Sequence, residues 1–253
     1  MTIYYAIIFF IFGITLGSFY NVVAYRVPRG ESIVFPPSHC PHCNHKLTPM
    51  ELIPIFSFLF QKGKCKNCKE KISWFYTIFE LFTGILFTLS YLVYGLSWDL
   101  WIVLSFLSML DIVIISDYQT FIIPDEVLIF FGMILSILLI SGYGVSYFFH
   151  QLLHGILSFG IMFLIKLLGD FLFKKESMGG GDIKLMFLFG LVLGTPLSLI
   201  SIFLGSIIGL PISYFFIAKN KEHIIPFGPF LSIGAIILVL MKVDFNMILE
   251  FIL

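Results

Sequence analysis

The sequence predicts an all-α polytopic membrane protein with about eight transmembrane helices and one small cytoplasmic insert. Hydrophobic residues make up 59% of the 253-residue chain and charged residues only 12%, with a mean hydropathy of +1.02. This composition lies far outside that of soluble domains. Apolar runs recur along the chain, and the basic residues gather between them. Because the formal net charge is zero, composition gives no argument for a nucleic-acid partner.

Eight apolar runs are expected to form the membrane-spanning helices. The first is interpreted as a retained helix, because it lacks a small-residue cleavage signal. Gly194-Thr195-Pro196 separates the sixth run from the seventh, and the count falls to seven if those two runs form one broken helix. The predicted spans are residues 3–25, 74–94, 99–116, 126–142, 145–173, 183–195, 196–218 and 227–243.

The basic residues predict the orientation of these helices. Eight of the fifteen Lys and Arg residues lie between Arg26 and Lys71, which places that segment in the cytoplasm by the positive-inside rule. The N-terminus is then outside, and the outer loops carry no Lys or Arg until Lys242. The later cytoplasmic loops carry Lys174, Lys175, Lys184, Lys219 and Lys221. This alternation supports eight spans over seven. The protein is expected to be a multi-pass protein of the inner or plasma membrane.

Residues 26–73 form the predicted insert, between a first helix at 1–25 and a helical bundle at 74–253. The insert contains all four cysteines, as two Cys-x-x-Cys pairs separated by 21 residues, which is close to zinc-ribbon spacing. A disulfide is disfavoured in the reducing cytoplasm, and a thioredoxin-like surround is absent. Its surplus of Lys suits either anionic lipid or a solvated face. The predicted structural Zn²⁺ ligands are Cys40, Cys43, Cys65 and Cys68, with His39, His42 and His45 as substitutes.

Two acids are predicted at the cytoplasmic edge of the membrane. Asp117 ends the third span, and Asp182 starts the sixth, directly after a glycine run at 179–181. Carboxylates at membrane depth are costly to desolvate and point to function. Two carboxylates in one site cannot both ionise easily, so one keeps a proton, as in aspartic proteases. The glycines would let the backbone bend and a second chain approach. The alternative is a glycine-rich turn with Asp182 as a helix N-cap and Lys184 as a surface charge.

Other polar residues are expected to be structural. Asp125 follows Pro124 and is interpreted as part of a helix start. Asp111 points about 120° away from Asp117 on a helix, so it is not expected to be the partner of that acid. His150 and His154 could bind a metal, but no acidic third ligand lies nearby and polar packing is favoured.

Two further patterns are assigned to helix stability. Lys166 and Asp170 have the spacing of an i,i+4 ion pair. Two Gly-x-x-x-Gly patterns, at 190–194 and 205–209, are expected to bring helices into close contact.

Several motifs together carry a resemblance to a known family. They are the Gly179-Gly180-Gly181-Asp182 motif with Ile183-Lys184-Leu185, Asp117 seven residues before Pro124, residues 17–23 and 25–32, the two cysteine pairs, residues 53–54, 63–65 and 72–73, Glu80, and residues 226–229. On these residues the chain resembles bacterial type IV prepilin peptidases, membrane aspartyl proteases of the Gly-x-Gly-Asp class. The resemblance spans nearly the whole chain.

The resemblance implies a bifunctional enzyme of the cytoplasmic membrane face. It implies that Asp117 and Asp182 are catalytic, supported by Gly179 and Gly181, and that the substrates are prepilins and pseudopilins cut after a glycine. It also implies methylation of the new N-terminus from S-adenosylmethionine. No dinucleotide-type glycine motif follows a strand, so Gly63 and Lys64 beside a cysteine pair are the only suggestion for the methyl-donor site.

Two other classes of protein compete with this interpretation. A transporter would also have intramembrane acids and broken helices. Its acids, however, are expected near the membrane midplane, and its fold is expected to contain an inverted repeat. A zinc-dependent membrane scaffold would use the insert as a binding module and would leave Asp117 and Asp182 unexplained.

Overall fold

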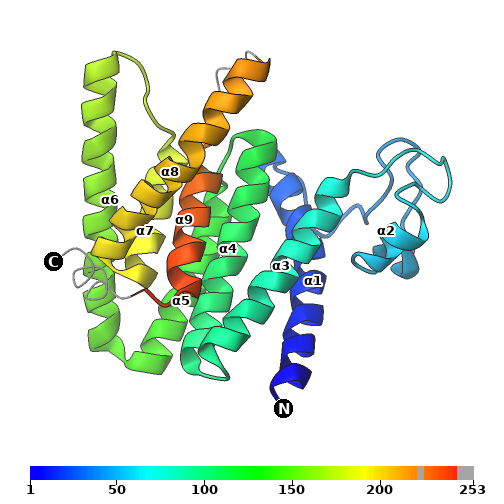
Figure 1. Cartoon of the computed structure of the whole chain (residues 1–253), viewed down its shortest axis with the longest axis horizontal. Coiled ribbons are helices and arrows are strands. Elements are labelled where there is room, and N and C mark those ends of the chain that lie inside the picture. Colours follow the sequence, from blue (N-terminus) through cyan, green and yellow to red (C-terminus); the bar gives the residue numbers. More distant parts are fainter. Residues whose placement is uncertain (221–224, 244–253) are drawn as a thin grey trace. The chain divides into compact units, whose positions relative to one another are not determined.

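The structure is a computed structural model that describes residues 1–220 and 225–243 (Figure 1). The chain divides into two compact units, Met1–Leu96 and Ser97–Leu253. Apart from two isolated β-bridges in the insert, the regular elements that these residues form are helices, which confirms the predicted fold class. Lys221 of the predicted cytoplasmic loops lies outside the described residues.

The first unit is built on two long helices that pack along each other, α1 (Thr2–Arg26) and α3 (Trp74–Tyr94). Their contact depends on small residues, because a Cβ added to Gly17 would lie 2.6 Å from Thr83 Oγ1. The rings of Phe9 and Tyr91 stack at 5.1 Å further along the pair. Small residues at a helix contact let the two backbones approach closely within lipid.

The insert between α1 and α3 contains three short helices and the cysteines. They are η1 (Val27–Arg29), η2 (Pro49–Leu52) and α2 (Phe56–Phe60). The Arg26 guanidinium donates to the carbonyl of Pro36 at 2.7 Å, which holds the start of the insert against the end of α1.

Among the described residues the second unit has six helices, and α4 is the most buried of those long enough to cross a membrane. Helix α9 packs against α4, α7 and α8 (Figure 1). The helices are α4 (Trp98–Thr120), α5 (Asp125–Tyr143), α6 (Val145–Phe173), α7 (Gly180–Leu193), α8 (Thr195–Asn220) and α9 (Gly228–Leu240).

Both Gly-x-x-x-Gly patterns lie at close helix contacts, as predicted. A Cβ on Gly190 of α7 would lie 2.5 Å from the carbonyl oxygen of His154 on α6. A Cβ on Gly205 of α8 would lie 2.8 Å from the carbonyl oxygen of Phe230 on α9. Gly194, with a φ of +79°, interrupts the helical conformation between α7 and α8, so they are separate helices.

Six of the described helices are long and apolar enough to cross a membrane: α1, α3, α4, α5, α6 and α8. The protein is therefore a multi-pass membrane protein. Helices α7 and α9 have 14 and 13 residues. At ~1.5 Å per residue each spans roughly 20 Å, less than a hydrocarbon core of ~30 Å. The count of eight spans stays a prediction.

Candidate active site and cysteine cluster

Asp117 lies in the last turn of α4, because this helix continues one turn beyond its predicted end at residue 116. The helix ends where Phe121 takes a left-handed conformation, and Ser116 donates to the carbonyl of Ile122 at 2.7 Å. The Asp117 side chain is buried and accepts a hydrogen bond of 3.1 Å from the backbone N–H of Gly228. The first residue of α9 thus holds one oxygen of this carboxylate.

Asp182 lies in the first turn of α7 and is also buried. Gly179 takes the N-cap position, so the alternative of Asp182 as an N-cap is wrong. The two carboxylates are close enough for the charge of Asp117 to act on Asp182. Within the described part of the chain, Asp182 Oδ1 is buried and has no hydrogen-bond partner. The geometry therefore brings the two acids together and leaves one oxygen of Asp182 unbonded.

Ile123 lies against two glycines at the site, Gly181 beside Asp182 and Gly228 beside Asp117. A Cβ added to Gly181 would lie 2.8 Å from Ile123 Cβ, and one added to Gly228 would lie 3.1 Å from Ile123 Cδ1. The close neighbour of Gly181 is thus the protein's own Ile123, and the approach of a second chain at the glycine run stays a prediction. Gly179 meets only Asp182 Oδ2, at an ordinary 3.6 Å, and has an extended φ of −67°.

The segment before the glycine run is fastened to the end of α6. Ser177 donates to Asp170 Oδ1 through its backbone N–H at 2.6 Å and its hydroxyl at 2.8 Å. Asp170 thus serves this loop, and the predicted ion pair with Lys166 does not form in the described residues. His154 meets Thr195 Oγ1 at 2.8 Å, which is the polar packing expected for it.

An ion pair that sequence reasoning missed joins α5 to α7. Lys184 Nζ lies 2.8 Å and 2.6 Å from the two oxygens of Asp125. Asp125 begins α5, as predicted, but it binds this lysine and does not cap the helix. Lys184 follows Asp182 by two residues, so the pair fixes the start of α7 beside α5.

We expect Lys184→Met to lower the free energy of unfolding by less than about 1 kcal/mol, because both side chains are about half exposed and solvent screens the pair. Thermal unfolding in detergent would measure this, with the exposed Lys175→Met as the matched control. A large loss of stability specific to Lys184→Met would contradict the prediction.

The four cysteines of the insert form one cluster, as predicted. Their sulfur atoms all lie within 4.8 Å of one another, with Cys40–Cys68 at 3.8 Å and Cys43–Cys65 at 3.9 Å. A tetrahedral site with Zn–S bonds of ~2.3 Å has sulfurs ~3.8 Å apart. The four cysteines are free thiols, and this geometry fits a metal ion. His45 instead contacts Glu51 at 3.2 Å.

The electrostatics of the cluster also favour a cation. The backbone N–H of His45 lowers the pKa of Cys43 to about 6, and the N–H groups of Cys68 and Asn67 lower the pKa of Cys65. Despite a backbone hydrogen bond at Glu70, desolvation and the neighbouring thiols raise the pKa of Cys68 to about 12. Four thiols this close cannot all ionise in the absence of a positive charge.

Gly63 and Lys64 lie at the start of the second cysteine pair. Gly63 has a φ of +67°, and a Cβ there would lie 3.0 Å from the Phe58 ring, so a conformational role accounts for this glycine. Lys64 is exposed, and its backbone forms an isolated antiparallel β-bridge with Lys71. The assignment of Gly63 and Lys64 to a methyl-donor site stays a prediction.

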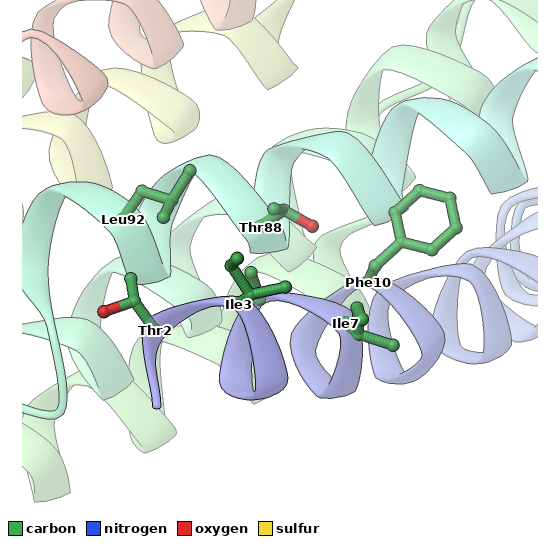
Figure 2. A pocket seen from close by; sticks show the side chains of 7 residues that line it. Thr2, Ile3, Ile7, Phe10, Thr88 and Leu92 are labelled. Atoms are coloured by element: carbon green, nitrogen blue, oxygen red, sulfur yellow. The ribbon is translucent and has the colours of Figure 1, made fainter.

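An apolar groove of about 420 Å³ lies elsewhere, between the beginning of α1 and the end of α3 (Figure 2). Its lining carries no acid, base or thiol, so it is not the reaction centre. The lining residues are Thr2, Ile3, Ala6, Ile7, Phe10, Thr88 and Leu92.

Comparison with known proteins assigns both units. Residues 11–94 match the Bacterial Peptidase A24 N-terminal domain, and residues 102–214 match the Type IV leader peptidase family. The chain is 39% identical to the prepilin leader peptidase/N-methyltransferase of Bacillus subtilis, over 91% of this chain and 92% of that protein.

Two further relatives agree with this assignment. The prepilin leader peptidase/N-methyltransferase of Neisseria gonorrhoeae is 32% identical, over 88% of this chain and 86% of that protein. The type 4 prepilin-like proteins leader peptide-processing enzyme of Escherichia coli is 33% identical, over 88% of this chain and 89% of that protein. No solved structure gives a significant match. The chain therefore belongs to the type IV leader peptidase family.

Proposed function

We propose that this protein is a bifunctional membrane enzyme, an aspartyl endopeptidase and N-methyltransferase. It removes the leader of type IV prepilins and pseudopilins after a glycine, at the cytoplasmic side of the inner membrane, and methylates the new N-terminus. Family membership supports both activities, since the relatives are prepilin leader peptidase/N-methyltransferases. The observation that carries the peptidase half is the buried pair of Asp117 and Asp182 on α4 and α7.

In the mechanism that we propose, the two carboxylates share one proton and hold a water molecule. The ionised carboxylate removes a proton from the water molecule while the water oxygen attacks the scissile carbonyl carbon. The protonated carboxyl gives its proton to the carbonyl oxygen. The carboxyl that took the water proton then passes a proton to the leaving amine nitrogen as the C–N bond breaks. Gly228 donates to Asp117 Oδ2, and the buried Asp182 Oδ1 has no hydrogen-bond partner among the described residues, which supports Asp182 as an acceptor for this water.

Charge supports a cytoplasmic active site. Asp117 and Asp182 lie at helix ends. By the positive-inside rule, the distribution of basic residues predicts that these ends are on the same side of the membrane as the lysine-rich insert. The insert itself is proposed to hold one structural Zn²⁺ through its four cysteines, which would fix the fold of a segment too small for a large core.

The methyl donor is proposed to be S-adenosylmethionine, which would supply the methyl group for the new N-terminal amine. The names of the relatives support the activity, and Gly63 and Lys64 stay the candidate region. Family membership disfavours the transporter and scaffold interpretations.

The function is tested by co-expressing the protein with a prepilin and measuring the substrate N-terminus by mass spectrometry. We expect loss of the leader together with the added mass of one methyl group. An intact leader on several prepilins would contradict the peptidase, and a cut but unmethylated product would contradict the second activity alone.

Gly228→Ala is expected to slow cleavage by about 10²-fold, because its Cβ would lie 2.7 Å from Asp117 Oδ2 and must displace that carboxylate. The effect should fall on kcat, measured with purified enzyme and prepilin. Gly160→Ala on α6 is the control, since nothing lies within 4 Å of a Cβ added there and no backbone has to move. Equal effects of the two variants on kcat would contradict a positioning role for Gly228.

A further inference from the structure

We infer that the short helix α2 of the insert dips into the membrane and buries its apolar face at the boundary between lipid headgroups and acyl chains. Three side chains of this helix are exposed: Phe56 at 53%, Leu59 at 56% and Phe60 at 84%. Their i, i+3 and i+4 spacing places them on one face. The inference concerns the first unit only and does not depend on the peptidase activity.

The depth of α2 follows from its attachment to α3. The backbone N–H of Ile55, the residue before α2, donates to Glu80 Oε2 at 2.8 Å. Glu80 is six residues into α3, which is roughly 9 Å along the helix axis. The exposed Trp74 begins α3, and tryptophan at such a position marks the membrane interface. The start of α2 therefore lies within about 9 Å of that level, the depth at which interfacial helices bury their apolar faces.

The opposite face of α2 is fixed against the same helix. Phe58 is buried, and its ring meets the ring of Trp74 at a centroid distance of 4.5 Å. Ile55 adopts a φ of +62°, a conformation that is strained for a β-branched residue. The hydrogen bond to the buried Glu80 holds this turn, so the orientation of α2 is set by the protein.

Lipid is the occupant that the surrounding surface favours. Exposed apolar residues continue along α3 at helical spacing, which is the pattern of a lipid-facing stripe. This stripe consists of Trp74, Ile78, Leu81, Ile85, Leu89 and Leu92. The Phe58–Trp74 contact holds α2 beside the first residue of this stripe, so the exposed face of α2 lies next to a surface with the pattern of a lipid-facing helix. The exposed Lys62 and Lys64 follow directly and suit anionic headgroups.

Photocrosslinking in bilayers of defined composition tests the inference. Benzoylphenylalanine is placed at position 60 of the full-length protein, which is reconstituted in phosphatidylethanolamine and phosphatidylglycerol nanodiscs. Mass spectrometry of the peptide after illumination is expected to find acyl-chain adducts. Position 56 is the second site on the same face, and position 66, an exposed lysine beside a cysteine, is the control expected to give none.

Two results would overturn the inference. The first is an acyl-adduct yield at positions 56 and 60 no higher than at position 66. The second is the replacement of lipid adducts by prepilin adducts when a prepilin is added, which would assign this face to substrate.

Discussion

Asp117→Asn and Asp182→Asn should each lower the rate of prepilin cleavage by about 10³-fold or more. Each asparagine keeps the size of the side chain but cannot exchange a proton with the water or the leaving amine. Since the two acids act as one unit, the double variant should be scarcely slower than either single variant. Single-turnover cleavage of a purified prepilin in nanodiscs would measure all three rates.

The control for this experiment is Glu126→Gln, which removes an exposed acid at the beginning of α5 and should retain the wild-type rate. Membrane insertion and thermal unfolding of each variant separate lost chemistry from lost folding. Near-normal cleavage by Asp182→Asn, with a slow Asp117→Asn, would show that the acids do not share the reaction.

Cys40→Ser should reduce the metal content of the protein from about one Zn²⁺ to near zero and unfold the insert. The four sulfurs have the separations of a tetrahedral site, and zinc binding to such sites contributes about 10–16 kcal/mol to folding. Elemental analysis by mass spectrometry measures the zinc, and limited proteolysis of residues 26–73 measures the loss of structure.

His42→Ala is the matched control for the metal prediction. His42 lies inside the first cysteine pair and is exposed, so its removal should leave the zinc content and the protease resistance unchanged. A strong chelator should reproduce the effect of Cys40→Ser on the wild-type protein. Stoichiometric zinc in Cys40→Ser, or a protease-resistant insert without metal, would contradict a structural zinc site.

Sequence patterns alone were enough to predict the membrane class and the extent of most helices. Residues 74–94 and 145–173 were predicted as spans and form α3 and α6 with the same bounds. Hydropathy and glycine punctuation are local signals, so they can be read without knowing what a helix packs against. The four-cysteine cluster could be predicted in the same way, because the spacing within each cysteine pair is a local pattern. The number of helices that cross the membrane was not fixed in this way, since α7 and α9 are short.

The way in which the two acids are held depends on contacts between helices that are distant in the sequence. The amide of Gly228 reaches Asp117 across 111 residues, and Lys184 reaches Asp125 across 59. Ile123 packs against glycines from both α7 and α9. No local pattern encodes such partners, because they depend on which helices become neighbours. A single-sequence reading could mark Asp117 and Asp182 as costly to bury, but the contacts that orient them exist only once α4, α5, α7 and α9 have packed together.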